Sequence, residues 1–265
     1  MNEIINEDVV SAWDAVSGAY QERYQIPATA IHLGPMVPPP VELGLDFAVV
    51  GRKVLDFGCG GGQNAVACAL AGAASVVGVD PSEGQLDRAR SLAVRSGVSA
   101  EFRNLQDGGL GSLPDDFDVV LSVYAFQFVA DLPTVLHELA SHMNMGGMLV
   151  LSVDHPMRLA GEWHDDKFVV DNYFARGWQT WPYDFPEADL RVTMRRFQRT
   201  TEEWINALLS ASFVLRGLYE PLPPVVPDSF GRKSKYGTDD PRNIFAKARL
   251  EKVPGSLILV AERAS

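Results

Sequence analysis

The chain has 265 residues, of which 46% are hydrophobic, enough for one large α/β domain with a buried core. Its formal net charge is −11, and its lysines and arginines cluster only at 191–199 and 231–235, so a nucleic-acid partner is disfavoured. The acidic N-terminus lacks the features of a signal peptide and no apolar run approaches a membrane span, so we expect a cytoplasmic protein without a membrane partner.

In chain order, the first expected element is a helix at 8–24, followed by a proline-containing linker at 27–40. We expect residues 1–50 to form an N-terminal helical cover and linker. From residue 51 strands and helices alternate, which is typical of parallel strands with helices on both faces of the sheet. The expected strands are 53–57, 75–80, 100–103, 117–122 and 148–153, and the expected helices are 64–70, 82–96 and 132–143.

This alternation stops after Pro156. Residues 157–200 are rich in aromatic side chains without a clear period, which predicts a lid or a wall over a site. A helix at 201–211, a strand at 213–220, a short helix near 241–250 and a strand at 257–261 follow. The whole is an α/β fold with a mostly parallel seven-stranded sheet. We expect residues 51–265 to be one Rossmann-like domain in which 157–200 are an insertion after the fifth strand.

The strongest chemical signal is the turn Gly58-Cys59-Gly60-Gly61-Gly62, which directly follows the strand at 53–57. Glycines there let a ligand approach the backbone, where a Cβ would collide. A dinucleotide site would have a third glycine at the position of Gln63. Asp56 would repel a pyrophosphate, but its carboxylate suits the α-ammonium group of an amino acid. The turn therefore favours S-adenosylmethionine (SAM) over a nicotinamide dinucleotide.

Several motifs in order resemble the class I SAM-dependent methyltransferases, in the small-molecule branch that includes the ubiquinone and menaquinone enzymes. After the glycine turn, Val77-Gly78-Val79-Asp80-Pro81-Ser82 resembles the motif whose acid holds the ribose hydroxyls, and Asp80 lies 20 residues after Gly60. The stretches 117–129 and 145–151 resemble the motifs of the fourth and fifth strands. The resemblance implies a Rossmann-like SAM-methyltransferase fold and SAM as the cofactor. The implied cofactor residues are Tyr20, Asp56, Gly58, Cys59, Gly60, Asn64, Asp80, Pro81, Ser82, Gln106, Asp107 and Ser122.

The family usually places an acid after the third strand to accept a hydrogen bond from adenine. Here either Gln106 or Asp107 could do so, and the sequence leaves both open. For the substrate, we expect contacts from the N-terminal helix, the fourth-strand motif and the aromatic segment. The residues assigned to the substrate are Tyr24, Gln127, Trp163 and Trp178.

His155 follows the fifth strand, at the sheet edge where ligands bind in open α/β folds. Two interpretations stay open: a general base or orienting group for the nucleophile, or a loop histidine that hydrogen-bonds the backbone. Cys59 and Cys68 are expected to be reduced thiols, and no side-chain spacing resembles a metal site.

The resemblance implies methyl transfer by direct displacement to an O, N, S or C nucleophile of a small, aromatic or heteroaromatic metabolite. Two alternatives stay open: a SAM-fold binding or regulatory subunit without catalysis, and an NAD(P)-dependent oxidoreductase. The sequence also leaves open whether the chain forms a homo-oligomer.

Overall fold

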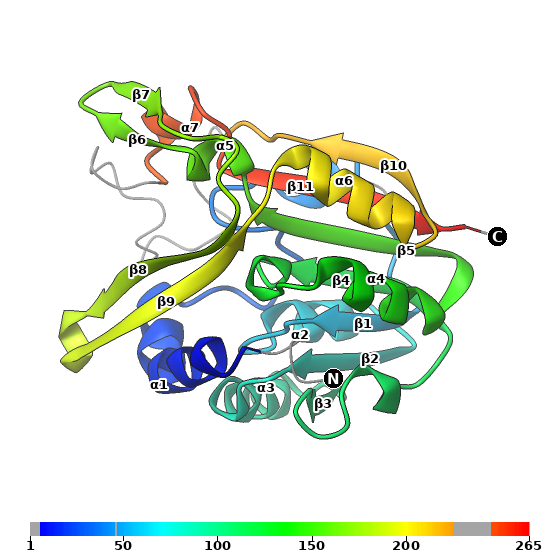
Figure 1. Cartoon of the computed structure of the whole chain (residues 1–265). Helices are drawn as coiled ribbons and strands as arrows, with labels where there is room; N and C mark the ends of the chain where they lie inside the picture. Colours follow the sequence, from blue (N-terminus) through cyan, green and yellow to red (C-terminus); the bar gives the residue numbers. More distant parts are fainter. Residues whose placement is uncertain (1–5, 46, 225–244, 265) are drawn as a thin grey trace.

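A seven-stranded sheet forms the centre of the molecule, as the computed structural model shows for residues 6–45, 47–224 and 245–264 (Figure 1). The strand order is β10-β11-β5-β4-β1-β2-β3, and β11 runs antiparallel to its neighbours β5 and β10. The bounds of these strands are β1 Lys53–Phe57, β2 Ser75–Asp80, β3 Glu101–Asn104, β4 Phe117–Val123, β5 Met143–Asp154, β10 Phe213–Tyr219 and β11 Ser256–Arg263. The prediction of a mostly parallel seven-stranded α/β sheet is confirmed.

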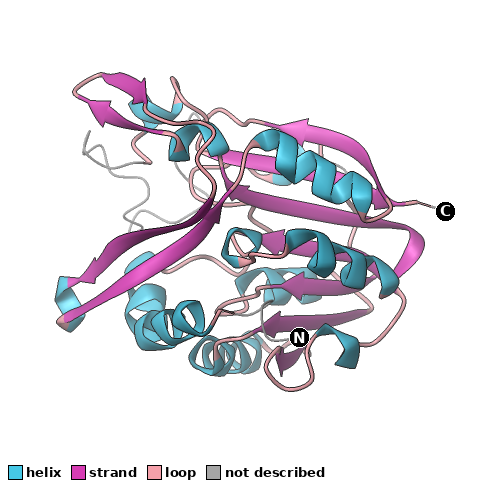
Figure 2. Cartoon of the chain, in the orientation of Figure 1, coloured by secondary structure: helices cyan, strands magenta, loops and turns pink. Residues whose placement is uncertain are grey.

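Helices cover both faces of this sheet (Figure 2). Their bounds are α1 Glu7–Tyr24, α2 Gln63–Leu70, α3 Glu83–Ser96, α4 Leu132–Ser141, α5 Pro156–Leu159, α6 Thr201–Ser210 and α7 Lys247–Leu250. Neighbouring residues of β1 point to opposite sides: Leu55 packs in the core that holds α4 and α6, and Val54 in the core that holds α2. This alternation follows from the two-residue period of a strand.

The helix ends follow their local sequence. Ser82 caps α3, because its hydroxyl accepts the amide hydrogen of Gln85. Thr200 and Glu203 form a reciprocal capping box at the start of α6. Both caps fix helices that directly follow segments which face the cavity described below.

The segment 157–200 differs from its prediction as aperiodic. After α5 it forms two β-hairpins, whose strands are β6 Gly161–His164, β7 Lys167–Val170, β8 Gly177–Phe185 and β9 Leu190–Gln198. The β8–β9 hairpin packs on α1, whereas β6–β7 projects near α7, away from α1 (Figure 1). The segment is therefore built from regular strands.

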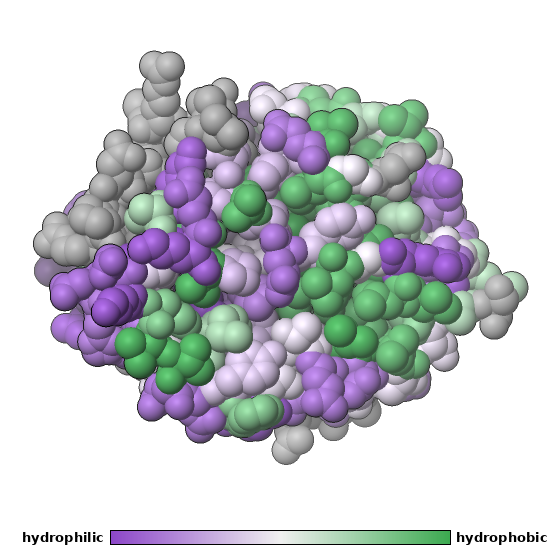
Figure 3. Space-filling view, turned by 90° about the horizontal axis from the view of Figure 1, so that it is seen from above, coloured by the Kyte–Doolittle hydropathy of each residue, from purple (hydrophilic) through white to green (hydrophobic). Residues whose placement is uncertain are grey.

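The surface mixes polar and apolar side chains, and on the face in Figure 3 the hydrophobic ones gather in separate patches. Among the helices that the structure describes, none is long and apolar enough to cross a membrane. Cys59 and Cys68 are buried and free, as expected for reduced thiols. The basic stretch at 231–235 and residues 241–244 of the expected short helix lie outside the described residues.

Candidate functional site

The glycine turn joins β1 to α2 in a backbone conformation that suits glycine. Gly58, Gly60 and Gly62 have φ values of 71°, 51° and 79°, in the left-handed region. A Cβ on Gly58 would lie 2.1 Å from the Cβ of Ala125, and one on Gly62 would lie 2.7 Å from the Cβ of Ala89. The turn thus packs closely against Ala125 after β4 and Ala89 of α3, and no side chain fits at Gly58 or Gly62.

Two carboxyl groups flank this turn, because β1 and β2 are parallel neighbours that end at the same sheet edge. Asp80 accepts hydrogen bonds from the amides of Gly60 (3.0 Å) and Ser82 (2.9 Å), and burial raises its pKa to about 6. Burial also raises the pKa of Asp56 to about 7. The Oδ2 atom of Asp56 is buried without a hydrogen-bond partner among the described residues. Both aspartates therefore offer acceptor capacity to a ligand.

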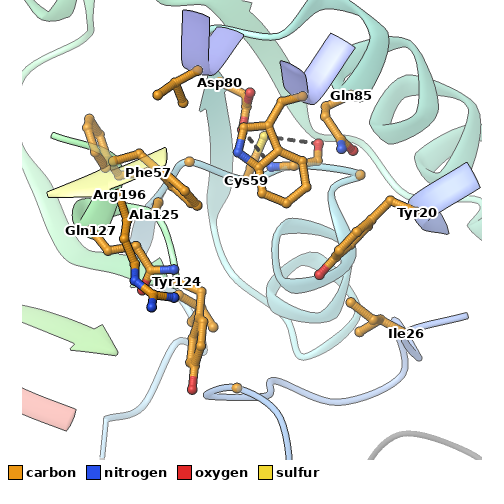
Figure 4. Close-up of a pocket in the computed structure, with 18 of the residues that line it drawn as sticks. Tyr20, Ile26, Phe57, Cys59, Asp80, Gln85, Tyr124, Ala125, Gln127 and Arg196 are labelled. Carbon is orange, nitrogen blue, oxygen red and sulfur yellow. Dashed lines mark hydrogen bonds between the residues drawn. The ribbon is translucent and has the colours of Figure 1, made fainter. Parts of the chain in front are cut away.

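Asp56 and Asp80 line a cavity of about 330 Å³. Its walls come from α1, the glycine turn, the ends of β4 and β5, and the β8–β9 hairpin. Figure 4 shows Asp80 and Gln85 at one end, and Arg196 reaching toward Gln127 and Tyr124 at another. The aromatic lining residues are Trp13, Tyr20, Tyr24, Phe57, Tyr124, Phe128, Trp181, Tyr183 and Phe245.

Helix α1 closes the cavity on the side of the glycine turn. The Asp14 carboxylate accepts hydrogen bonds from the hydroxyl of Ser82 (2.6 Å) and the amide of Gly84 (3.0 Å). The Gln21 amide bridges Gln63 and Gln85. These bonds dock α1 across the first turns of α2 and α3 and bring Tyr20 and Tyr24 into the lining.

Eight of the twelve residues assigned to the cofactor line this cavity: Tyr20, Asp56, Gly58, Cys59, Gly60, Asn64, Asp80 and Pro81. Asn64 also holds the N-terminal linker, since its side-chain amide exchanges two hydrogen bonds with the backbone of His32 (2.9 and 3.0 Å). Burial raises the pKa of the Cys59 thiol well above its usual value, so it is neutral. The structure thus brings these eight residues to one cavity, and their contact with the cofactor stays a prediction.

The other four assigned residues do not line the cavity. Ser82 is used as the cap of α3 and as a donor to Asp14. Ser122 is fully buried beneath the cavity wall, and its hydroxyl has no partner among the described residues. Gln106 and Asp107 are exposed, whereas their neighbour Leu105 lines the cavity. The turn after β3 therefore presents an apolar side chain where a polar adenine contact was expected.

His155 is buried but is not part of the cavity lining. Its Nδ1 accepts the amide hydrogen of Met157 (3.0 Å), which caps α5, and its Nε2 lies 2.8 Å from the carboxylate of Glu220. Burial lowers the pKa of the imidazole, and the contact with Glu220 opposes this shift. With both ring nitrogens engaged, the geometry favours the backbone-bonding interpretation over the catalytic one.

Of the residues assigned to the substrate, Tyr24 and Gln127 line the cavity and Trp163 and Trp178 do not. Trp163 lies on β6 and packs against Phe168 and Arg249, while Trp178 packs against Phe197 and Arg195. The hairpin contributes Trp181, Tyr183 and Arg196 instead. Side chains of one strand alternate between its faces, so Trp178 and Trp181 face opposite sides of β8.

The sequence interpretation missed Arg196, Arg158 and His32, which all line the cavity. Arg196 was one of several arginines in a stretch taken only as a basic cluster, and the alternation along β9 could have separated it from Arg195. Burial lowers the pKa of His32 to about 4, so this imidazole is neutral at pH 7. Within the described residues, no group of three or more His, Cys, Asp or Glu could hold a metal ion.

The chain is similar to known proteins over two different lengths. The family described as a methyltransferase domain matches residues 54–147. An uncharacterised protein of Haemophilus influenzae is 30% identical over 243 residues, 86% of this chain and 93% of that protein. A ubiquinone biosynthesis O-methyltransferase of Rhizobium johnstonii is 38% identical over 111 residues, 42% of this chain and 44% of that enzyme. This chain thus matches less than half the length of that curated relative.

A crystal structure of an S-adenosylmethionine-dependent methyltransferase from Mesorhizobium loti superposes with a TM-score of 0.62 at 25% identity. The superposition covers 84% of this chain and 96% of that one. The shared region therefore extends beyond the segment 54–147 to most of the sheet and its covering helices.

Proposed function

Because the chain belongs to the class I SAM-dependent methyltransferases, we propose that it methylates an O, N, S or C nucleophile of a small aromatic or heteroaromatic metabolite. Within this proposal, residues 1–50 form a cover, residues 51–265 form the catalytic domain, and 157–200 form its lid and substrate segment. One observation carries the proposal: the buried Asp56 and the partly buried Asp80, from adjacent strands, line a single cavity whose remaining walls are largely aromatic.

The residues at the aspartate end fit SAM. Asp80 has acceptor capacity for the ribose hydroxyls beyond the two backbone amides that it already binds. The unpartnered oxygen of Asp56 suits the ammonium group, because a buried carboxylate without a partner is costly and a cation compensates it. When bound, SAM supplies an electrophilic methyl group on a cationic sulfur.

The protein's part in the reaction is to hold the nucleophile in line and to exclude water. Tyr24 of α1 and Tyr183 of β8 meet across the cavity through a hydrogen bond of 2.7 Å between their hydroxyls. Holding a nucleophile in line with the methyl group and the sulfur can lower the free-energy barrier of a bimolecular reaction by roughly 7–11 kcal/mol. A dedicated base is not required for a nucleophile that carries no proton. The aromatic walls and the volume of about 330 Å³ favour a small aromatic acceptor.

The assignment of the cofactor end is tested with Asp80→Ala. Charge-assisted hydrogen bonds contribute about 1.5–3 kcal/mol, so affinity for S-adenosylhomocysteine (SAH) should fall by about 10- to 100-fold. Calorimetry of the folded variant measures this change. Asp87→Ala is the matched control, because Asp87 is 73% exposed and outside the cavity lining. Unchanged affinity in Asp80→Ala would contradict the placement of the ribose.

Methyl transfer itself is tested by incubating the protein with methyl-labelled SAM and a panel of small aromatic compounds. Label should move to at least one of them. If SAH binds tightly but no compound of any class accepts the label, the chain would be a SAM-fold binding protein without catalysis.

A further inference from the structure

A cluster of three charged side chains lines the cavity at the end of β5. We name Asp154, Arg158 and Arg196 the arginine cluster; all three line the cavity. Asp154 forms ion pairs with Arg158 and, at 3.5 Å, with Arg196. The side chains of Asp154 and Arg158 are 7% and 9% exposed, so solvent screens these charges little.

Within the cluster, the Asp154 carboxylate contacts both guanidinium groups. Arg158 and Arg196 are the only lysine or arginine side chains among the described lining residues, and the His32 imidazole is neutral at pH 7. Asp80 lies at the other end of the cavity, where it accepts a hydrogen bond from Gly60, and Asp56 is on the neighbouring strand beside the glycine turn. One carboxylate therefore serves two guanidinium groups.

Arg196 is the less satisfied of the two partners. It has a single long contact with Asp154, and its Nε has no hydrogen-bond partner among the described residues. Its guanidinium lies 4.6 Å from the centre of the Trp181 ring, which fixes its orientation. Burial lowers its pKa to about 10, so it stays cationic at pH 7. A buried guanidinium with free donors is costly unless an anion binds it.

The wall opposite Arg196 is held rigidly. Tyr124 follows β4 with a φ of 58°, an unusual conformation for a residue with a side chain. Its hydroxyl lies 2.7 Å from that of Ser256, and its ring fills the space where a Cβ on Gly34 would sit. Figure 4 shows Arg196 reaching toward this ring. Strained backbone at a cavity wall is typical of ligand sites.

We propose that the arginine cluster binds a carboxylate of the methyl acceptor, so that the substrate is an aromatic acid. This inference rests on the proposed function and deepens it by naming the class of substrate. The planar fork of Arg196 matches a carboxylate in two hydrogen bonds. A carboxylate is planar like this fork, whereas a phosphate monoester is tetrahedral and carries a charge of about −1.5 to −2. Trp181 and Tyr183 supply aromatic surface beside it.

The test compares acids with their neutral amides as ligands. Benzoate, phenylacetate and indole-3-acetate are each titrated against benzamide, phenylacetamide and indole-3-acetamide, with and without saturating SAH. At least one acid should bind about 10- to 100-fold more tightly than its amide, the range for charged hydrogen bonds. Arg196→Gln should abolish this preference, and Arg196→Lys, which keeps the charge but loses the fork, should retain part of it.

Arg195→Gln is the matched control, because Arg195 is the next residue on β9 but pairs with Asp8 outside the cavity. It should leave the preference for acids unchanged. Equal binding of acid and amide in every pair, or no binding of any acid, would overturn the inference. Tighter binding of phenyl phosphate than of benzoate would also overturn it.

A further comparison separates the substrate's carboxylate from that of the cofactor. SAH carries a carboxylate and 5′-methylthioadenosine lacks the whole amino-acid group. If Arg196→Gln weakens SAH alone, the cluster binds the cofactor and the inference fails. If the wild-type protein binds no SAH, the proposed function fails, and the titrations without SAH still decide whether the cluster prefers acids.

Discussion

Asp56 lines the cavity and has one buried carboxylate oxygen without a hydrogen-bond partner among the described residues, and burial raises its pKa to about 7. A cationic ligand binds the ionised form, so the affinity for SAH should rise as pH increases through the pKa of Asp56. Between pH 6 and 7.5, below the α-amino pKa of about 7.7–8.0, we expect a rise of roughly five- to tenfold. Calorimetry across this range measures it.

Two controls isolate Asp56 in this pH dependence. Asp56→Asn keeps the shape of the side chain but cannot ionise, so most of the dependence should disappear. The neutral ligand 5′-methylthioadenosine should show a weaker dependence with the wild-type protein. A flat affinity for SAH from pH 6 to 7.5 would show that Asp56 does not face the ammonium group.

For His155 the sequence left a catalytic and a backbone-bonding interpretation open, and the geometry favours the second. Because its Nδ1 caps α5, His155→Ala should lower the free energy of unfolding by about 1 kcal/mol, as removal of a helix cap does. The kcat for methyl transfer should change only a few-fold. Chemical denaturation and single-substrate kinetics measure the two effects. A fall in kcat by roughly 10²–10⁴-fold at unchanged stability would restore the histidine as a base.

At the scale of elements, the β8–β9 hairpin lines the cavity but is a two-stranded sheet separate from the main sheet. Its base is anchored by Arg199, whose guanidinium donates to the carbonyls of Val129 and Ala130. Its tip meets α1 through Arg23 and Glu187, an ion pair in which Glu187 is half-exposed. The Arg23 side chain is buried and lies over the ring of Phe185, so apolar packing also holds the tip on α1.

Because the β8–β9 hairpin is a two-stranded sheet separate from the main sheet and lines the cavity, ligand binding should slow hydrogen exchange in residues 177–198. Exchange is measured in the free protein and with SAH together with an accepted aromatic substrate. The β6–β7 hairpin is the internal control: it has the same architecture but lies away from α1, and its exchange should stay unchanged. Maximal protection of β8–β9 in the free protein would show that it is a static wall and not a lid.

The hairpin also shows what sequence patterns can and cannot supply. The alternation of Trp181, Tyr183 and Phe185 has the two-residue period of a strand, so the signal was present but was obscured by Trp178, Pro182 and the aromatic residues before them. The strands of the main sheet were found because each is a short apolar run beside a helix of clear period. Which tryptophan faces the cavity depended on the register of the hairpin, which the residues alone did not fix.

For the whole molecule, the buried acids make the stability of the ligand-free protein depend on pH. The folded-state pKa of Asp56 is about 7 and its ordinary value is 3.8, so its charged form is disfavoured in the folded protein. Its contribution to stability is fully present below pH 3.8 and is lost as pH rises to about 7. Asp56→Asn should thus become more stable than the wild type by a few kcal/mol between pH 4 and 8.

Urea unfolding at pH 4, 6 and 8 without ligand measures this difference. His32 acts in the opposite direction, because its pKa is lowered to about 4 and stability falls as the pH drops below its ordinary value. It is present in both proteins, so its effect cancels in the difference. A constant difference between Asp56→Asn and the wild type over this range would mean that Asp56 is ionised with a partner.

The cofactor end of the site was predictable because it is local in sequence: Asp56, Gly58, Gly60 and Asp80 belong to two neighbouring strand–turn units. The other end was not predictable, because tertiary packing brings its residues to one cavity. Tyr24 of α1 lies more than a hundred residues before Arg158 and Arg196 in the sequence. Gln106 and Asp107 lie in an exposed turn after β3 and do not line the cavity, so their contact with adenine stays a prediction.

The packing of α1 on the β8–β9 hairpin has a consequence for synthesis of the chain. Translation proceeds from the N-terminus, so α1 leaves the ribosome long before residues 177–198 that cover it. Val16, which is fully buried against Phe185 and Met194, has no complete partner surface until then. The helix that begins the described chain is therefore among the last elements to find its final place, and the cavity cannot exist before it does.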